Sequence, residues 1–152
     1  MQKYIDTGIM KDRTEPVMVF KNDRELNECV KWWQSKLFLN NWWIVAHLVD
    51  PKEIPNHAGE NHFVHESHSS VINVAKLTEQ QRKDGIVKSC DEETVVHELL
   101  HLKYNLVGFD DDNCSYEQCY LDMNEHALLE EMAKSLISVK YDLPQEWWYN
   151  SD

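Results

Sequence analysis

The sequence has few of the residues that mark fibrous, exported or membrane-spanning proteins. Only four glycines and four prolines occur in 152 residues, which excludes collagen-like and low-complexity chains. No apolar run approaches the roughly 20 residues that are needed to cross a bilayer. The N-terminus also lacks the apolar stretch of a secretory signal peptide. We therefore expect a cytoplasmic protein.

Cysteine is scarce, and its spacing suggests no disulfide framework. The four cysteines are Cys29, Cys90, Cys114 and Cys119. Without an export signal they are predicted to be reduced thiols. Cys114 and Cys119 are spaced too loosely for a zinc knuckle, so packing is the favoured role. A single domain over residues 1–152 buries roughly 68–70% of its unfolded surface and needs no covalent staple.

The chain has far fewer basic than acidic residues. The 27 acidic residues outnumber the 15 lysines and arginines, which gives a formal net charge of -12. Such a chain repels phosphate backbones and anionic lipid headgroups, so neither nucleic acid nor a membrane is an expected partner. The same charge favours the binding of cations. The hydrophobic content of 42% excludes a disordered chain.

The hydrophobic pattern predicts an α+β fold. The run at 42–49 is apolar almost throughout, as in a strand buried on both faces, whereas 62–68 is typical of a polar edge strand. A further short strand is indicated at 17–20. The predicted architecture is a small mixed sheet flanked by one N-terminal helix and two later helices. The remaining predicted elements are helix 22–38, strand 70–75, the short helix or turn 78–83, helix 91–104 and the long helix 115–140.

The strongest chemical signal is the pentapeptide His97-Glu98-Leu99-Leu100-His101. Helical residues four apart share a face, so both imidazoles can bind one zinc ion. Glu98 is placed to take a proton from a water on that ion. Apolar residues cover the rest of this helix, and a buried polar sector needs a partner such as a metal. The alternative is two core histidines bonded to backbone, with Glu98 facing solvent.

A catalytic zinc site needs a third protein ligand and an open position. A third ligand close behind the motif would require glycine at position 104 and His or Asp at position 107. These positions hold Tyr104 and Val107, so the ligand must come from elsewhere. The long helix offers Glu125, near the centre of a predicted apolar stripe, where a carboxylate needs a metal or a cationic partner. His126 and Glu130 are the next candidates, off that stripe. The stripe consists of Leu121, Leu128, Leu129, Met132, Leu136 and Val139.

Together these residues resemble the gluzincin zinc metallopeptidases. The motif from His97 to His101 is followed 24 residues later by Glu125, in the run Glu125-His126-Ala127-Leu128-Leu129-Glu130-Glu131-Met132-Ala133. The short chain is similar to the compact minigluzincins and to small metallopeptidases of phages and their bacterial hosts. Lys103 departs from the resemblance, because zincins usually have an apolar residue there.

The resemblance implies a zincin-like fold in which a small sheet lines an active-site cleft. It also implies His97, His101 and Glu125 as zinc ligands and Glu98 as general base. The expected activity is zinc-dependent hydrolysis of peptide bonds in a peptide or protein substrate. The alternative is a non-catalytic, metal-stabilised binding or regulatory module, such as an anti-repressor of a phage element. A structural zinc site has four protein ligands, and the absence of a clear fourth favours catalysis.

Half of the eight histidines lie within twelve residues, at His57, His62, His65 and His68. A solvated edge strand beside the cleft is favoured over a second metal site. His65 or His68 is a candidate for contact with the substrate or with the tetrahedral intermediate.

Two further segments are expected to be structural. The acidic run at 110–112 lacks the spacing of an EF-hand, which favours a solvated loop over a calcium site. The aromatic run 147–149 is predicted to cover an edge of the core, rather than to form a dimer contact or to plug the cleft.

Overall fold

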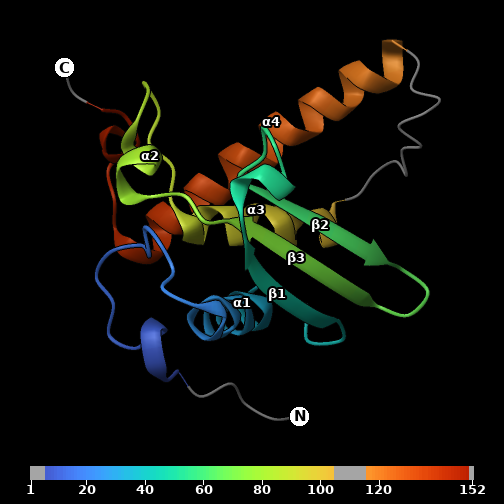
Figure 1. Cartoon of the computed structure of the whole chain (residues 1–152), viewed down its shortest axis with the longest axis horizontal. Coiled ribbons are helices and arrows are strands. Elements are labelled where there is room, and N and C mark those ends of the chain that lie inside the picture. The colour runs from blue at the N-terminus through green and yellow to red at the C-terminus, as the bar shows by residue number, and fades with distance from the viewer. Residues whose placement is uncertain (1–5, 105–115, 151–152) are drawn as a thin grey trace.

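A computed structural model describes residues 6–104 and 116–150, and of residues 116–122 it describes the backbone alone. A three-stranded sheet packs against helices, which confirms the predicted α+β class (Figure 1). The elements are α1 (Asp23–Lys36), β1 (Trp43–Val49), β2 (Gly59–Val64), β3 (Ser69–Ala75), α2 (Glu79–Lys83), α3 (Asp91–Lys103) and α4 (Tyr116–Tyr141), with 3-10 turns at Gly8–Met10, Pro51–Glu53 and Gln145–Trp148.

The sheet has the strand order β1–β3–β2, with β1 parallel and β2 antiparallel to the central β3. Ala46, Ile72 and Val74 are fully buried, whereas Trp43 and Val71 are 76% and 41% exposed. One face is therefore covered and the other is open. The prediction of a strand at 42–49 buried on both faces is wrong, because its apolar composition does not reveal that β1 is an edge strand.

The second strand lies earlier in the chain than predicted. β2 ends at Val64, and residues 65–68 form the turn into β3, where His68 has a φ of 48°. The register pairs Gly59 with Val74 and Val64 with Ser69. This pairing places residues 59–61 at the start of the strand, and β2 contacts α3.

Helix α3 lies at the centre of the molecule. It contacts β2 and β3 on one side and α1 and α4 on others, and Figure 1 shows it behind the sheet between these two helices. Every residue from Asp91 to Leu100 is buried. This confirms the expectation that the helix is enclosed almost all round. Its polar residues are not confined to one narrow sector, because Asp91, Glu92 and Glu93 are buried as well.

Buried carboxylates hold the N-terminus of α3 in place. Glu92 accepts a hydrogen bond from the Val17 amide at 2.8 Å, and Asp91 accepts one from the Phe20 amide at 2.9 Å. The segment predicted as a strand at 17–20 instead donates its amides to these side chains, so that prediction is wrong. Further donors to the two carboxylates are Arg82, Trp33, Lys140 and Tyr141.

Helix α4 buries only part of the predicted stripe: Leu129 is fully buried, and Met132 and Leu136 are partly buried against the core. Leu129, Ala133 and Ile137, spaced four residues apart, are fully buried, whereas Leu128 and Val139 are 51% and 82% exposed. The apolar residues of α4 are spread around its circumference, so their pattern does not single out one face. The observed face decides which side chains of α4 reach α3.

The C-terminal aromatic residues cover an edge of the core, as predicted. Trp148 is buried, and its indole nitrogen donates to the Ser138 hydroxyl at 2.8 Å. Tyr149 forms an antiparallel bridge with Val87.

Cys29 and Cys90 are buried free thiols, which agrees with a packing role. Cys114, the side chain of Cys119 and the acidic run 110–112 lie outside the described residues. Within the described parts of the chain, no helix is both long enough and apolar enough to span a membrane.

Candidate metal centre

Helices α3 and α4 bring three histidines together. His97, His101 and His126 each offer one ring nitrogen, and these nitrogens all lie within 4.8 Å of one another. The Nε2 atoms of His97 and His101 are 3.2 Å apart, and the ring of His126 stacks on that of His97 at a centroid distance of 5.6 Å. Among the side chains that the structure describes, these three histidines are the group of His, Cys, Asp or Glu residues that could hold a metal ion.

The three histidines differ in their exposure to solvent. His97 is buried, His101 is half-buried one turn later on α3, and His126 is exposed on α4. The i, i+4 spacing places His97 and His101 on one face of α3, and α4 supplies the third ring from across the helix contact. A metal ion held by this triad would therefore sit at the rim of the core, within reach of solvent.

Glu130 stands directly behind the triad. Its Oε1 lies 3.1 Å from Nδ1 of His97, and its other oxygen accepts from Lys134 at 2.9 Å. Lys134 also donates to the buried Glu93 at 2.6 Å. Oε1 of Glu130 and Nδ1 of His97 are close but do not have hydrogen-bond geometry, so Glu130 places a negative charge beside the ring while Nε2 is left for a metal. A carboxylate next to a ligating histidine is common at metal sites. Glu130, which the sequence placed off the apolar stripe, is exposed and contacts α3 at His97.

The histidines differ in how easily they take up a proton. Burial, together with neighbouring His97 and His126, lowers the pKa of His101 to about 4, so this ring is neutral at physiological pH. Burial opposes the charged form of His97 as well, but contact with Glu130 and the charge of Glu98 outweigh burial and raise its pKa. A neutral imidazole is the form that binds a metal, and His101 is already in it.

Glu98 is buried between α3 and the edge strand β2. Its side chain is shielded from solvent, and burial raises its pKa to about 7. A Cβ at Gly59 would lie 3.4 Å from its Oε1 and 2.6 Å from Cγ2 of Thr94, so the bare glycine lets β2 approach this closely. The alternative in which Glu98 faces solvent is therefore excluded.

The edge strand is tied to α3 at the position of Glu98. The Asn61 side-chain amide donates to the backbone carbonyl of Glu98 at 2.8 Å. The Ser70 hydroxyl on β3 in turn donates to the Asn61 side chain at 2.6 Å. Strand β2 and the helix that carries Glu98 are thus held in a fixed relation.

A pocket of about 230 Å³ joins Glu98 to two histidines of the triad, His97 and His126. The pocket lies between α3, α4 and the loop before β2, and this loop contributes Asn56 and His57. Neither residue was predicted as a site residue from the sequence. The cluster of four histidines between residues 57 and 68 was the feature of the sequence that could have indicated a site role for His57. The lining residues are Asn56, His57, Ala58, Gly59, Thr94, His97, Glu98, His126 and Glu130.

The other histidines of the 57–68 segment form no metal centre within the described residues. His68 stacks on Trp42 at 5.0 Å with an interplanar angle of 13°, and His65 meets the same indole edge-on at 5.6 Å. Both lie at the turn between β2 and β3, apart from the lining of the pocket at Glu98. Contact of His65 or His68 with a substrate stays a prediction.

Glu125, the third ligand predicted from the sequence, directly precedes His126 on α4 and is half-buried. The group of converging ligand atoms contains His126 in that place. Successive helical residues point about 100° apart, so the rotation of α4 about its axis decides which of the two faces the other histidines. The role of Glu125 as a ligand stays a prediction, and the geometry adds His126 as the candidate that already faces His97 and His101.

Comparisons with protein-family models, with curated proteins and with solved structures find no match for this chain. The function of the centre therefore has to be inferred from its own chemistry.

Proposed function

We propose that this protein is a zinc-dependent hydrolase of zincin-like fold that cleaves peptide bonds in a peptide or protein substrate. His97, His101 and His126 would hold the zinc, and Glu98 would act as general base. The proposal is carried by one observation: His97 and His126, two of the three convergent histidines, line a pocket with the buried carboxylate of Glu98, whose pKa is raised to about 7.

The donor set fits zinc. Zinc in proteins takes histidine nitrogens readily, and catalytic sites use three protein ligands and keep a fourth position open. His126, the outermost ligand, is exposed, which leaves room for a substrate on that side. When bound, zinc would polarise the scissile carbonyl and make a water molecule more acidic.

Glu98 has the properties of a general base. A base works best when its pKa is close to the working pH, and burial raises that of Glu98 to about 7. Its carboxylate would take a proton from the attacking water and later pass it to the leaving amine. Glu130 would hold the ring of His97 in place through its Nδ1 contact of 3.1 Å.

The edge strand suits a peptide substrate. Strand β2 pairs with β3 on one side, and within the described chain no strand pairs with its other edge. An extended peptide can add to such an edge through backbone hydrogen bonds. Because β2 starts at Gly59, which lines the pocket with Glu98, a peptide along this edge would pass the candidate catalytic residues.

Cleavage of a peptide pool tests the proposal. We expect the zinc-loaded protein to produce new peptide termini detectable by mass spectrometry. A chelator should abolish the cleavage, and added zinc should restore it. If the protein binds zinc but cleaves no member of a pool of diverse sequence, the metal-stabilised binding module becomes the better interpretation.

A further inference from the structure

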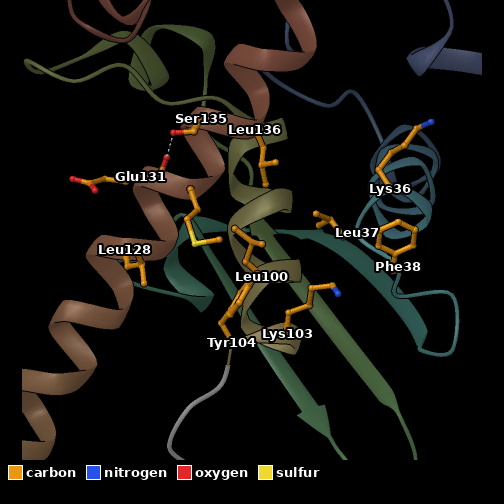
Figure 2. Close-up of a pocket in the computed structure, with 11 residues that line it drawn as sticks. Lys36, Leu37, Phe38, Leu100, Lys103, Tyr104, Leu128, Glu131, Ser135 and Leu136 are labelled. Atoms are coloured by element: carbon orange, nitrogen blue, oxygen red, sulfur yellow. Dashed lines mark hydrogen bonds between the residues drawn. The ribbon is translucent and has the colours of Figure 1, made fainter.

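A second pocket lies between the C-terminal ends of α1 and α3 and the middle of α4 (Figure 2). Its volume is about 520 Å³, within the 300–1,000 Å³ range of small-molecule sites. It shares no lining residue with the pocket at Glu98. Its walls are mostly apolar, built from Leu37, Leu100, Leu128, Met132 and Leu136.

Exposed apolar side chains gather at the rim of this pocket. Phe38 is 84% exposed, Leu128 is 51% exposed and Tyr104 is 41% exposed. Phe38 also has a φ of 56°, a left-handed conformation that a bulky residue rarely adopts. Contiguous exposed apolar surface on a soluble domain commonly marks a binding site.

Two lysines supply positive charge on the α1 side of the pocket. The ammonium of Lys103 lies 6.0 Å from the ring centroid of Phe38, and Lys36 is two residues before Phe38 in the chain. In the part of the chain that the structure describes, neither ammonium lies within 4.0 Å of a carboxylate. The lysines that form ion pairs there are Lys83, Lys134 and Lys140.

The pocket offers few polar groups besides these lysines. Its walls come from the middle of α4 and from the last turns of α1 and α3, where the final backbone carbonyls have no partner within the helix. The Ser135 hydroxyl donates a hydrogen bond to the Glu131 backbone carbonyl at 2.8 Å. Figure 2 shows the Glu131 carboxylate turned away from the pocket. An extended peptide would find no strand edge here, whereas an apolar chain with one anionic end would meet apolar walls and the ammonium of Lys103.

We propose that this pocket binds a medium-chain fatty acid, with its alkyl chain between Leu37, Leu100 and Leu136 and its carboxylate near Lys103. The inference does not depend on zinc or on hydrolysis. It also assigns a role to Lys103, the residue that departs from the zincin pattern, because an ammonium at this point balances the charge of a carboxylate that enters an apolar site.

Calorimetric titration of the full chain with decanoate, decanol and decyltrimethylammonium tests the proposal. All three have a ten-carbon chain and differ in head group. We expect saturable binding of decanoate, and binding at least about tenfold weaker for the other two, since a charge-assisted contact is worth that much. No saturable binding of decanoate, or equal binding of all three, would overturn the proposal.

Two variants and one control locate the site. Lys103→Glu should weaken decanoate binding at least about tenfold and leave decanol unchanged. Leu128→Glu, at an exposed rim position, should weaken both ligands without altering the fold, as checked by an unchanged Tm. Lys76→Glu makes the same charge change at an exposed lysine outside the pocket and should leave decanoate binding unchanged. If Lys76→Glu acts as strongly as Lys103→Glu, net charge and not the pocket explains binding.

Discussion

Replacing His126 with alanine is expected to weaken zinc binding by more than about 100-fold. Partners that only orient a ligand contribute 10–100-fold to affinity, and the loss of a direct ligand should exceed that range. Because His126 is exposed on α4, its loss should leave the core intact. Competition with a chromophoric chelator of known affinity measures the change, and the Tm of the metal-free variant checks the fold.

The neighbouring variant Glu125→Gln is the matched control, since it removes one charge from the adjacent position of the same helix. If His126 is the third ligand, this variant should retain zinc within a few-fold of the parent. The opposite pattern, with zinc lost from Glu125→Gln and retained by His126→Ala, would show that the carboxylate predicted from the sequence is the ligand. Helix α4 would then have to be rotated about its axis by about 100°, the angle between successive residues.

Glu130→Gln should have an intermediate effect. It keeps the size of the side chain and removes the charge that lies 3.1 Å from Nδ1 of His97. A loss of zinc affinity between about 10-fold and 100-fold is expected for such an outer partner. The predicted apolar stripe of α4 would instead have implied no effect, so this variant also tests the register of the helix.

Replacing Glu98 with glutamine is expected to lower kcat/KM for a cleaved peptide by about 10² to 10⁴, the usual contribution of a general base. The amide has nearly the same shape and fits the space beside Gly59, but it cannot accept the proton from water. Zinc affinity should stay within a few-fold of the parent. Cleavage kinetics and chelator competition on the same preparation separate the two effects.

Glu131→Gln provides the control for that experiment. It makes the same change at an exposed carboxylate of α4 that lies outside the pocket at Glu98. This variant should cleave at the rate of the parent. If Glu98→Gln also cleaves at the parental rate, Glu98 is not the base, and the proposed chemistry has to be abandoned.

The features that could be predicted from the sequence are local ones. His97 and His101 lie one turn apart on a helix, so their common face follows from helical geometry alone. The buried character of α3 followed from apolar residues on every side of the motif. The central strand β3 was found within one residue of its observed start, because Val71, Ile72 and Val74 are β-branched residues that favour strands.

The features that could not be predicted depend on how distant elements are placed. Whether β1 is central or at an edge is set by the strand order, which no single segment encodes. The third ligand depends on the rotation of α4 about its own axis, and apolar residues on several sides leave that rotation open. The position of Glu98 against Gly59 joins residues 39 apart in the chain, so it required the structure.

X-ray absorption spectroscopy of the zinc-loaded protein at the zinc edge, with the metal content measured on the same sample, tests the central claim most directly. The account predicts about one zinc per chain, with three imidazole nitrogens at about 2.0–2.1 Å, and two imidazoles in His126→Ala. Absence of zinc after loading, sulfur in its coordination shell, or only two imidazoles in the parent protein would contradict it.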